Sequence, residues 1–226
     1  MISWRLRPTA LRAGAAALGL GLALGGCSSD GGGDWLAMLR ATRTAWDERD
    51  APVAVDQAAA IPYATLGIRI DGAREQILVL AMDNAGERLW ASSAHIAITT
   101  RLGRIVQTAG LGHDLGGFRV MEGSPLDWTI AHNYIWNADL ADLGYYALPI
   151  HCAMAPAGKD PIEIFGKTFD TVRVDETCHA EKIDWSFTNS YWVNPDTGRV
   201  WRAIEHVHPK GPVLEIRLLR PPLSAG

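Results

Sequence analysis

The spacing of apolar and polar residues changes twice along this chain. Residues 13–26 form an uncharged, glycine-rich run after a basic start. Between residues 34 and 52 the apolar side chains recur at helical spacing, and from residue 66 onward they form short or alternating runs separated by turn residues. A period near 3.6 indicates a helix, and a period of two indicates strands. The pattern therefore predicts a leader, one helix and a mainly β body.

The predicted helix begins at Asp34, whose side chain suits an N-cap, and ends before Pro52. Trp35, Leu39 and Trp46 lie on its apolar stripe. These tryptophans could lie at a membrane interface, but packing of the stripe against the body is the preferred interpretation.

The β body is predicted from runs rich in branched and aromatic residues. The predicted strands are 66–70, 77–82, 88–92, 95–99, 104–108, 127–136, 145–151, 162–165, 171–176, 185–193, 200–205 and 213–219. Turns are expected at Asp71-Gly72, at 83–86, at 101–103 and at 194–198, where proline and glycine favour a hairpin. A glycine-rich stretch covers 110–123, and residues 138–143 are the segment after residue 50 that most favours helix. We expect a mainly antiparallel β fold, either a sandwich or a barrel.

A weak internal repeat suggests two related β units. Trp90 lies 13 residues before Gly103, and Trp185 lies 13 residues before Gly198, so the two stretches align without a gap at an offset of 95. The units would cover about 60–112 and 160–220, although chance similarity between hairpins is the alternative.

The start of the chain has the features of an export signal. Arg5, Arg7 and Arg12 precede the uncharged run, which ends in Leu24-Gly25-Gly26-Cys27. This tetrapeptide resembles the lipobox of bacterial lipoproteins. The resemblance implies cleavage before Cys27, acylation of that cysteine with chains such as palmitate, and tethering to a bilayer. An ordinary cleaved signal and an uncleaved anchor are the alternatives, but the run is short for a spanning helix.

The expected organisation is therefore a signal peptide over 1–26, a lipidated Ser/Gly linker over 27–33 and a mainly β lipoprotein domain over 34–226. Several acyl chains hold a protein to a membrane where one does not. Ser28 stands where an aspartate would favour inner-membrane retention in enteric bacteria, so we expect outer-membrane sorting, although Asp30 weakens this expectation slightly.

Charge and composition narrow the class of partner. The 226-residue chain carries a formal charge of −4, and loss of three arginines with the signal would change this to −4 − 3 = −7. An acidic body argues against nucleic acid as a partner and against broad adhesion to anionic lipid. No later run is long and apolar enough to span a bilayer.

Cysteine use agrees with export. With Cys27 as the anchor, Cys152 and Cys178 remain, and an oxidising compartment favours a disulfide between them. The neighbouring His151 and His179 allow a metal site as the alternative, but the spacing lacks the CxxC pattern of structural zinc sites.

Several runs resemble one known family in order along the chain. The runs are 61–66, 103–111, 114–115, 125–126, 189–201, 212–216 and 221. Together with the lipobox they resemble the YjbF/GfcB family of lipoproteins, the group 4 capsule-polysaccharide type. Gly112 departs from the family pattern, in which proline is expected. The resemblance implies an outer-membrane lipoprotein that supports polysaccharide production or export, and it supplies no catalytic residues.

The aromatic residues give a candidate glycan site. Flat rings suit the C–H faces of sugars, and carboxylates bind hydroxyl groups. The candidates are Trp128, Trp136, Trp192, Trp201, Tyr145 and Asp139. The alternative, which we prefer, is that most of these rings fill the core of a β protein.

Other candidate chemistry is weaker. His206 and His208 share one side of a predicted strand and could bind a metal with His132, but a strand end in solvent is the preferred interpretation. His113-Asp114 could serve acid–base catalysis, but it lies among glycines that predict a mobile loop. Asp139 and Asp142 could form the carboxylate pair of a glycosidase, but the sequence does not fix the distance between them. GxSxG, HExxH and phosphate-loop motifs are absent from the sequence.

We therefore expect a non-catalytic accessory of exopolysaccharide or capsule export, lipid-anchored on the periplasmic side of the outer membrane, without cofactor or metal. Its partners would be glycan or export proteins. A periplasmic polysaccharide-modifying enzyme, either a hydrolase or a lyase, is the alternative function, and a general envelope scaffold is a third.

Overall fold

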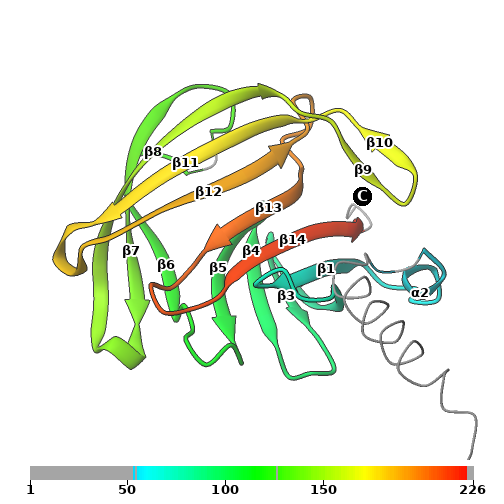
Figure 1. Ribbon diagram of the computed structural model, residues 1–226, viewed down its shortest axis with the longest axis horizontal. Coiled ribbons are helices and arrows are strands. Elements are labelled where there is room, and N and C mark those ends of the chain that lie inside the picture. The colour runs from blue at the N-terminus through cyan, green and yellow to red at the C-terminus, as the bar shows by residue number, and fades with distance from the viewer. Residues whose placement is uncertain (1–52, 54, 126, 223–226) are drawn as a thin grey trace, which may run out of the picture. The chain divides into compact units, whose positions relative to one another are not determined.

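The computed structural model describes Val53, residues 55–125 and residues 127–222, all within the compact unit 41–226 (Figure 1). The elements are α2 (Val55–Ala59), β1 (Thr65–Ile70), β2 (Gln76–Asn84), β3 (Glu87–Ala91), β4 (Ala97–Arg101), β5 (Arg104–Ala109), β6 (Gly117–Glu122), β7 (His132–Leu140), η1 (Ala141–Leu143), β8 (Tyr145–Lys159), β9 (Ile162–Ile164), β10 (Lys167–Phe169), β11 (Val172–Ala180), η2 (Glu181–Ile183), β12 (Trp185–Val193), β13 (Val200–His206) and β14 (Val213–Arg220). Among these residues, no helix is long and apolar enough to cross a membrane.

One antiparallel sheet contains twelve of the strands, in the order β5-β4-β3-β2-β1-β14-β13-β12-β11-β8-β7-β6. The sheet curls until its two edge strands, β5 and β6, approach each other (Figure 1). The Thr108 amide of β5 donates to the Leu115 carbonyl in the connection to β6, 2.9 Å away. The result is a nearly closed, barrel-like sheet, which confirms the mainly antiparallel β class.

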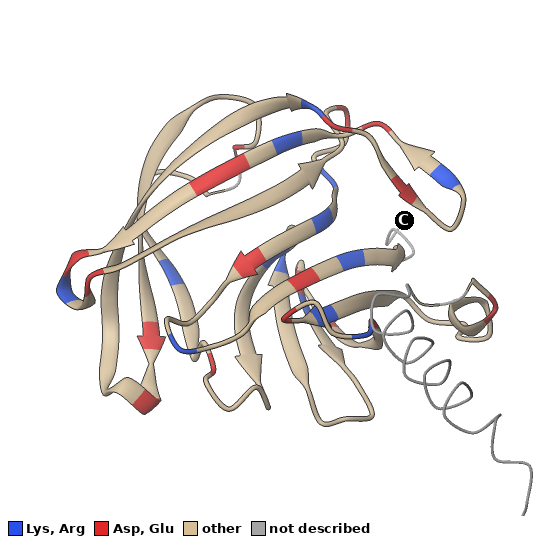
Figure 2. Ribbon diagram, in the orientation of Figure 1, with Lys and Arg blue, Asp and Glu red and all other residues tan. Residues whose placement is uncertain are grey.

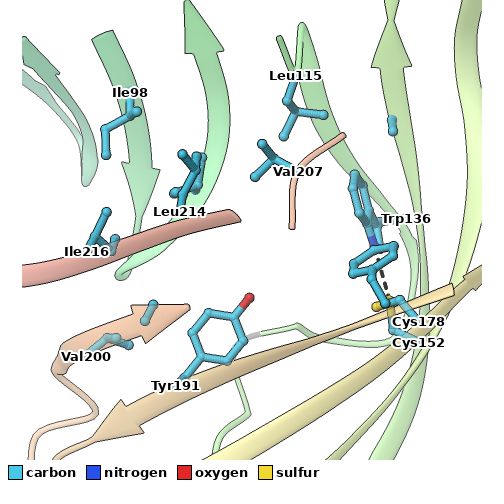
Figure 3. Packing of buried hydrophobic residues seen from close by; sticks show 14 of the residues in the cluster. Ile98, Leu115, Trp136, Cys152, Cys178, Tyr191, Val200, Val207, Leu214 and Ile216 are labelled. Atoms are coloured by element: carbon cyan, nitrogen blue, oxygen red, sulfur yellow. Dashed lines mark hydrogen bonds between the residues drawn. A yellow bond between two sulfur atoms is a disulfide. The ribbon is translucent and has the colours of Figure 1, made fainter. Parts of the chain in front are cut away.

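The core lies inside the curl because alternate residues of each strand point inward. Ile98 of β4, Leu115 of the connection between β5 and β6, and Leu214 and Ile216 of β14 belong to this core (Figure 3). In β12, Phe187, Asn189, Tyr191 and Val193 face this interior, as the alternation predicts. Several of the inward-facing residues are polar, and they form the site described below.

The outer face carries a smaller cluster. Val53, Ala58 of α2, Ile164 of β9 and Leu219 of β14 pack together there. The β9–β10 hairpin forms its own two-stranded sheet beside the main one (Figure 1). Acidic and basic residues are interspersed along the strands (Figure 2).

Several secondary-structure predictions need correction. Residues 127–131 are not strand, because Asp127 Oδ1 accepts hydrogen bonds from the amide and hydroxyl of Thr129 and forms a turn. Residues 138–140 are the end of β7 and 141–143 a 3₁₀ turn, so the predicted helix is wrong. The strand β6 lies within the glycine-rich stretch, where no strand was predicted.

Two further groups of predictions concern the internal repeat and the N-terminal segments. Gly103 lies between β4 and β5 and Gly198 between β12 and β13, so both aligned glycines occupy strand connections. Duplication of the two units stays a prediction. The signal, Cys27, the linker and the helix predicted over 34–52 lie outside the described residues.

Candidate functional site

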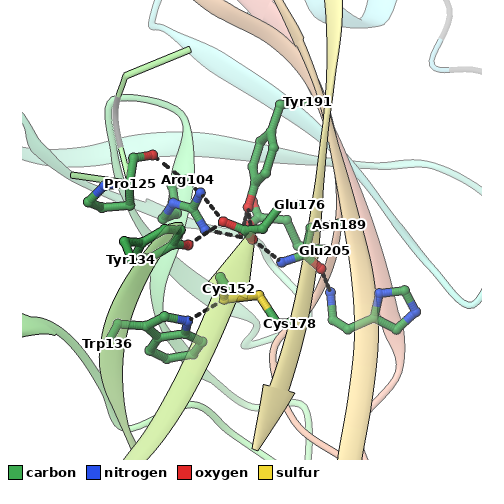
Figure 4. The surroundings of a disulfide bond; sticks show 11 residues. Arg104, Pro125, Tyr134, Trp136, Cys152, Glu176, Cys178, Asn189, Tyr191 and Glu205 are labelled. Carbon is green, nitrogen blue, oxygen red and sulfur yellow. Dashed lines mark hydrogen bonds and ion pairs between the residues drawn. A yellow bond between two sulfur atoms is a disulfide. The ribbon is translucent and has the colours of Figure 1, made fainter. Parts of the chain in front are cut away.

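A group of polar side chains meets in the middle of the curled sheet (Figure 4). We call it the interior cluster; it consists of Arg104 of β5, Tyr134 of β7, Glu176 of β11, Asn189 and Tyr191 of β12, and Glu205 of β13. Each residue is at most 3% exposed. Polar groups at this depth must find partners inside the protein, since water does not supply them.

Arg104 is held by an ion pair and by aromatic faces. Its Nη1 and Nη2 donate to Glu176 Oε2 and Oε1 at 3.0 and 2.7 Å. The guanidinium carbon lies 4.8 Å from the ring centre of Tyr191 and 5.7 Å from that of Trp128, distances that suit cation–π attraction. Burial disfavours its charge, yet the attraction of Glu176 raises the pKa of Arg104 above its usual value.

The two buried glutamates take opposite protonation states. Burial acts on both, but Arg104 and the hydrogen bonds from Tyr134 and Asn189 lower the pKa of Glu176. Burial raises the pKa of Glu205 to about 8. At neutral pH the cluster therefore holds one carboxylate and one carboxylic acid.

The hydrogen bonds of Glu205 fit a protonated side chain. One oxygen accepts from the Ile105 amide at 3.1 Å, and Oε2 lies 3.1 Å from the phenolic oxygen of Tyr191. A proton on Oε2 can be donated to Tyr191, whose own hydroxyl then donates to Glu176, 3.3 Å away. An acid next to a carboxylate is the pair that glycosidases use, but both groups here are closed from solvent and cannot touch a substrate. The cluster is structural in this state.

The predicted disulfide is confirmed. Cys152 of β8 and Cys178 of β11 are directly paired in the sheet and joined by an S–S bond on the interior side (Figure 4). Trp136 Nε1 donates to Cys152 Sγ at 3.2 Å. Because the cysteines are joined, they are not thiolate ligands, and the alternative metal site with His151 and His179 is wrong for this state.

The six candidate glycan residues do not share one surface. Trp128 and Trp136 are buried inside the curl, where Trp128 packs on Tyr191. Trp192 lies on the outer face, and its Nε1 donates to Asp160 at 2.8 Å.

The remaining candidates lie elsewhere again. Half-buried Trp201 packs on Phe169, with ring centres 3.9 Å apart. Half-buried Tyr145 lies beneath Lys182 near the β7–β8 turn, and Asp139 accepts a hydrogen bond from the Ala147 amide. Glycan binding by this set stays a prediction, and a single stacking platform is not formed.

The histidine predictions need correction. Among the described residues, His208 is grouped with His113 and Asp142 and not with His206, and it is buried rather than exposed at a strand end. The turn after β13 folds back, so that the Lys210 amide donates to His208 Nδ1 at 3.0 Å. Its Nε2 lies 2.9 Å from Asp142 Oδ1, while His113 Nδ1 lies 2.7 Å from Asp142 Oδ2.

This second group, the turn cluster of His113, Asp142 and His208, is a hydrogen-bonded group rather than a metal site. Because His208 Nδ1 accepts a hydrogen bond, the neutral ring carries its proton on Nε2 and offers no lone pair there. The hydrogen bond from His113, followed by that from His208, lowers the pKa of Asp142. The neighbouring Asp114 accepts hydrogen bonds from Thr108, Gly110 and Leu111 and thereby ties down the loop over 110–116.

A cavity of about 1010 Å³ opens at the opposite end of the sheet, where β4 turns into β5 and β12 into β13. Leu66, Trp90, Ile216 and Leu218 contribute to its wall. These residues are far apart in the sequence, and the sequence pattern placed each of them only within a predicted strand.

The fold, the buried ion pair and the cavity define a class: antiparallel β proteins with one large curled sheet around a core that contains a buried polar cluster. Residues 38–219 match the family model described as "Group 4 capsule polysaccharide lipoprotein gfcB, YjbF". The chain belongs to this family, and the resemblance noted from its sequence is confirmed.

Two relatives from Escherichia coli (strain K12) illustrate the similarity. The "Uncharacterized lipoprotein GfcB" is 22% identical over 181 residues, which are 78% of this chain and 85% of the relative. The crystal structure of "the hypothetical lipoprotein YmcC" is similar with a TM-score of 0.62 and 20% identity, covering 88% of this chain and 100% of that one. At this identity the structural likeness shows the fold alone.

Proposed function

We propose that the protein is a non-catalytic, lipid-anchored accessory of capsule or exopolysaccharide production or export, on the periplasmic side of the outer membrane. The observation that carries this proposal is the match of residues 38–219 to a family of capsule-polysaccharide lipoproteins. The Leu24-Gly25-Gly26-Cys27 run supports it, because it supplies the acylation site that such a protein needs.

The geometry favours an accessory over an enzyme. A glycan hydrolase needs two carboxyl groups that face a substrate across an open cleft. Glu176 and Glu205 are closed from solvent, and Asp83 is the one acid among the described residues that line the large cavity. A smaller pocket on the outer face is lined by Asp160, Glu163 and Glu215, but Asp160 accepts a hydrogen bond from Trp192 and Glu215 is paired with Arg202. A hydrolase or lyase is therefore the less favoured function.

The function is tested by deleting the gene and measuring secreted polysaccharide. We expect less polymer in the deletion strain and recovery with the wild-type gene. Cys27→Ala, which removes the acylation site, should fail to restore the polymer although the protein is exported. Unchanged polymer in the deletion strain would remove the export role.

The location is tested separately with Ser28→Asp. This variant keeps Cys27 and its acyl chains but carries the residue that favours retention in the inner membrane of enteric bacteria. Membrane fractionation should find wild type in the outer membrane, with acyl groups on Cys27 by mass spectrometry. Loss of polymer in both variants assigns the function to the outer membrane, whereas loss in Cys27→Ala alone would show that any membrane suffices.

A further inference from the structure

We propose that the large cavity binds an anionic amphiphile, a ligand with a long acyl chain and an acidic head group. The chain would occupy the apolar wall and the head group would lie at the arginine-bearing mouth. A volume of about 1010 Å³ is at the upper end of the range found for small-molecule sites.

The inner wall offers apolar contact. Leu66, Ile216 and Leu218 are buried residues whose side chains line it. Trp90 also contributes to the wall, and its Nε1 is already bonded to Thr100 Oγ1 at 2.9 Å. A sugar would lose hydrogen bonds to water in such a space, while an acyl chain loses none.

The mouth has an excess of positive charge. Four arginines and one aspartate are among the described lining residues. Arg88 is paired with Asp83, and Arg202 with Glu215, each at 2.8 Å. Two arginines of the described lining are not paired with an acid in this way. Arg199 is exposed and lies 5.5 Å from the centre of the Trp201 ring, and Arg220 donates to the carbonyls of Ile61 and Ala59. An acidic head group complements this charge.

The rim also exposes apolar side chains. Tyr63 is 64% exposed and Leu102 is 53% exposed, and both line the cavity. Apolar groups in solvent beside a cavity mark sites that contact ligand or lipid. Apolar wall, basic mouth and apolar rim together match the two halves of an amphiphile.

Binding is measured with 11-(dansylamino)undecanoic acid on the whole mature chain, residues 27–226 with Cys27→Ser, so that no attached acyl group competes. Trp90 and Trp201 line the cavity and should transfer excitation energy to the bound dansyl group. We expect saturable binding, displaced by palmitate and more weakly by hexadecanol, which has the chain but no charge. Absence of saturable binding would overturn the proposal. The same holds if binding is absent because residues 34–52 of the chain occupy the cavity.

Two variants separate the chain from the head group. Ile216→Trp places a large ring in the wall and should weaken binding of the probe by at least about tenfold. Arg199→Glu reverses an exposed charge at the mouth and should weaken palmitate about fivefold while leaving hexadecanol unchanged. The matched control is Arg119→Glu, an exposed arginine of β6 that does not line the cavity.

The outcomes are decisive even if Ile216→Trp fails to fold, because Arg199→Glu changes only the surface. Equal affinity of wild type, Arg199→Glu and Arg119→Glu for palmitate would overturn the role of the mouth. This proposal goes beyond the export function and is tested on purified protein, so failure of binding and failure in the deletion strain are distinguishable.

Discussion

At the scale of single residues, Glu176 and Glu205 show how position decides the charge of a side chain. Both are buried, and their strands flank β12 on either side. Glu176 faces the guanidinium of Arg104 and stays ionised, while Glu205 faces a backbone amide and a phenol and holds its proton at neutral pH. The same side chain is therefore half of an ion pair in one place and a neutral hydrogen-bonding group in the other.

This difference predicts unequal effects of the same substitution. Glu176→Gln leaves the buried Arg104 without its counter-charge, and we expect a loss of about 3–5 kcal/mol in the free energy of unfolding. Glu205→Gln replaces a neutral acid by a neutral amide that can make the same hydrogen bonds to Ile105 and Tyr191, so we expect less than about 1 kcal/mol. Urea denaturation measures both, and equal losses would contradict the assignment of charges.

Glu205 also predicts a pH dependence of stability. Its pKa is about 8 in the folded protein and 4.5 as the ordinary value, so folding takes up a proton between these limits. The stabilisation is full below about pH 4.5 and is lost as the pH rises toward 8. Glu176, Arg104, Tyr134 and Tyr191 face the same space.

Their titration is common to wild type and to Glu205→Gln, so the difference between the two proteins isolates Glu205. We expect wild type to lose stability relative to Glu205→Gln between about pH 5 and pH 8 in urea denaturation. A difference that does not change with pH would show that Glu205 is ionised throughout.

Sequence reasoning placed two residues of the interior cluster on the correct face of their strand but did not predict the cluster. Alternation placed Asn189 and Tyr191 on the inner face of their strand, which the structure confirms. The partnership of Arg104 with Glu176 spans 72 positions and that of Ile105 with Glu205 spans 100. Strand periodicity states which face a residue lies on, but only the order of strands in the sheet states what it meets.

At the scale of elements, prediction succeeded where alternation and turn residues agreed. The strand over 185–193 coincides with β12, and the hairpin turn at 194–198 is closed by a hydrogen bond from the Gly198 amide to the Asn194 carbonyl. Prediction failed at β6, which begins at Gly117 in a glycine-rich stretch and yet pairs with β7 as a strand. Pairing to a neighbouring strand overrode weak local preference.

The disulfide predicts a measurable contribution from one pair of elements. Joining Cys152 to Cys178 closes a loop of 178 − 152 − 1 = 25 residues in the unfolded chain. The double variant Cys152→Ala/Cys178→Ala should lose about 3 kcal/mol in the free energy of unfolding.

Denaturation under non-reducing conditions measures this loss, with wild type unfolded in reductant as the control, since reduced wild type should approach the double variant. Because both cysteines are buried, native wild type should resist reduction until it unfolds. Equal stability of the oxidised wild type and the double variant would contradict this contribution.

At the scale of the whole molecule, the curl must protect the two strands at which the sheet ends. Edge strands expose backbone groups that invite pairing with other chains. Here Glu205 accepts from the Ile105 amide of β5, and the Thr108 hydroxyl accepts from the Leu115 amide in the connection to β6. Side chains and a loop thus satisfy groups that a neighbouring strand would otherwise bind.

The turn cluster predicts how one end of the molecule is held. Asp142 joins the β5–β6 connection through His113 and the β13–β14 connection through His208. Asp142→Asn should speed amide hydrogen exchange over 110–116 and 208–212 while leaving the core strands unchanged. The control is Asp184→Asn, an exposed residue directly after the η2 turn. Equal exchange in the two variants would show that the cluster does not hold these connections.

If Cys27 is acylated, one contact also sets how far this protein can travel from a bilayer. The Val53 amide donates to Glu75 Oε2 at 2.7 Å, and Arg217 Nε donates to Glu75 Oε1 at the same distance, so Val53 is held at a fixed point beside the sheet. Between Cys27 and Val53 lie 53 − 27 = 26 residue steps. At roughly 3.5 Å per fully extended step, an acylated Cys27 would confine that point to within about 90 Å of the lipid surface.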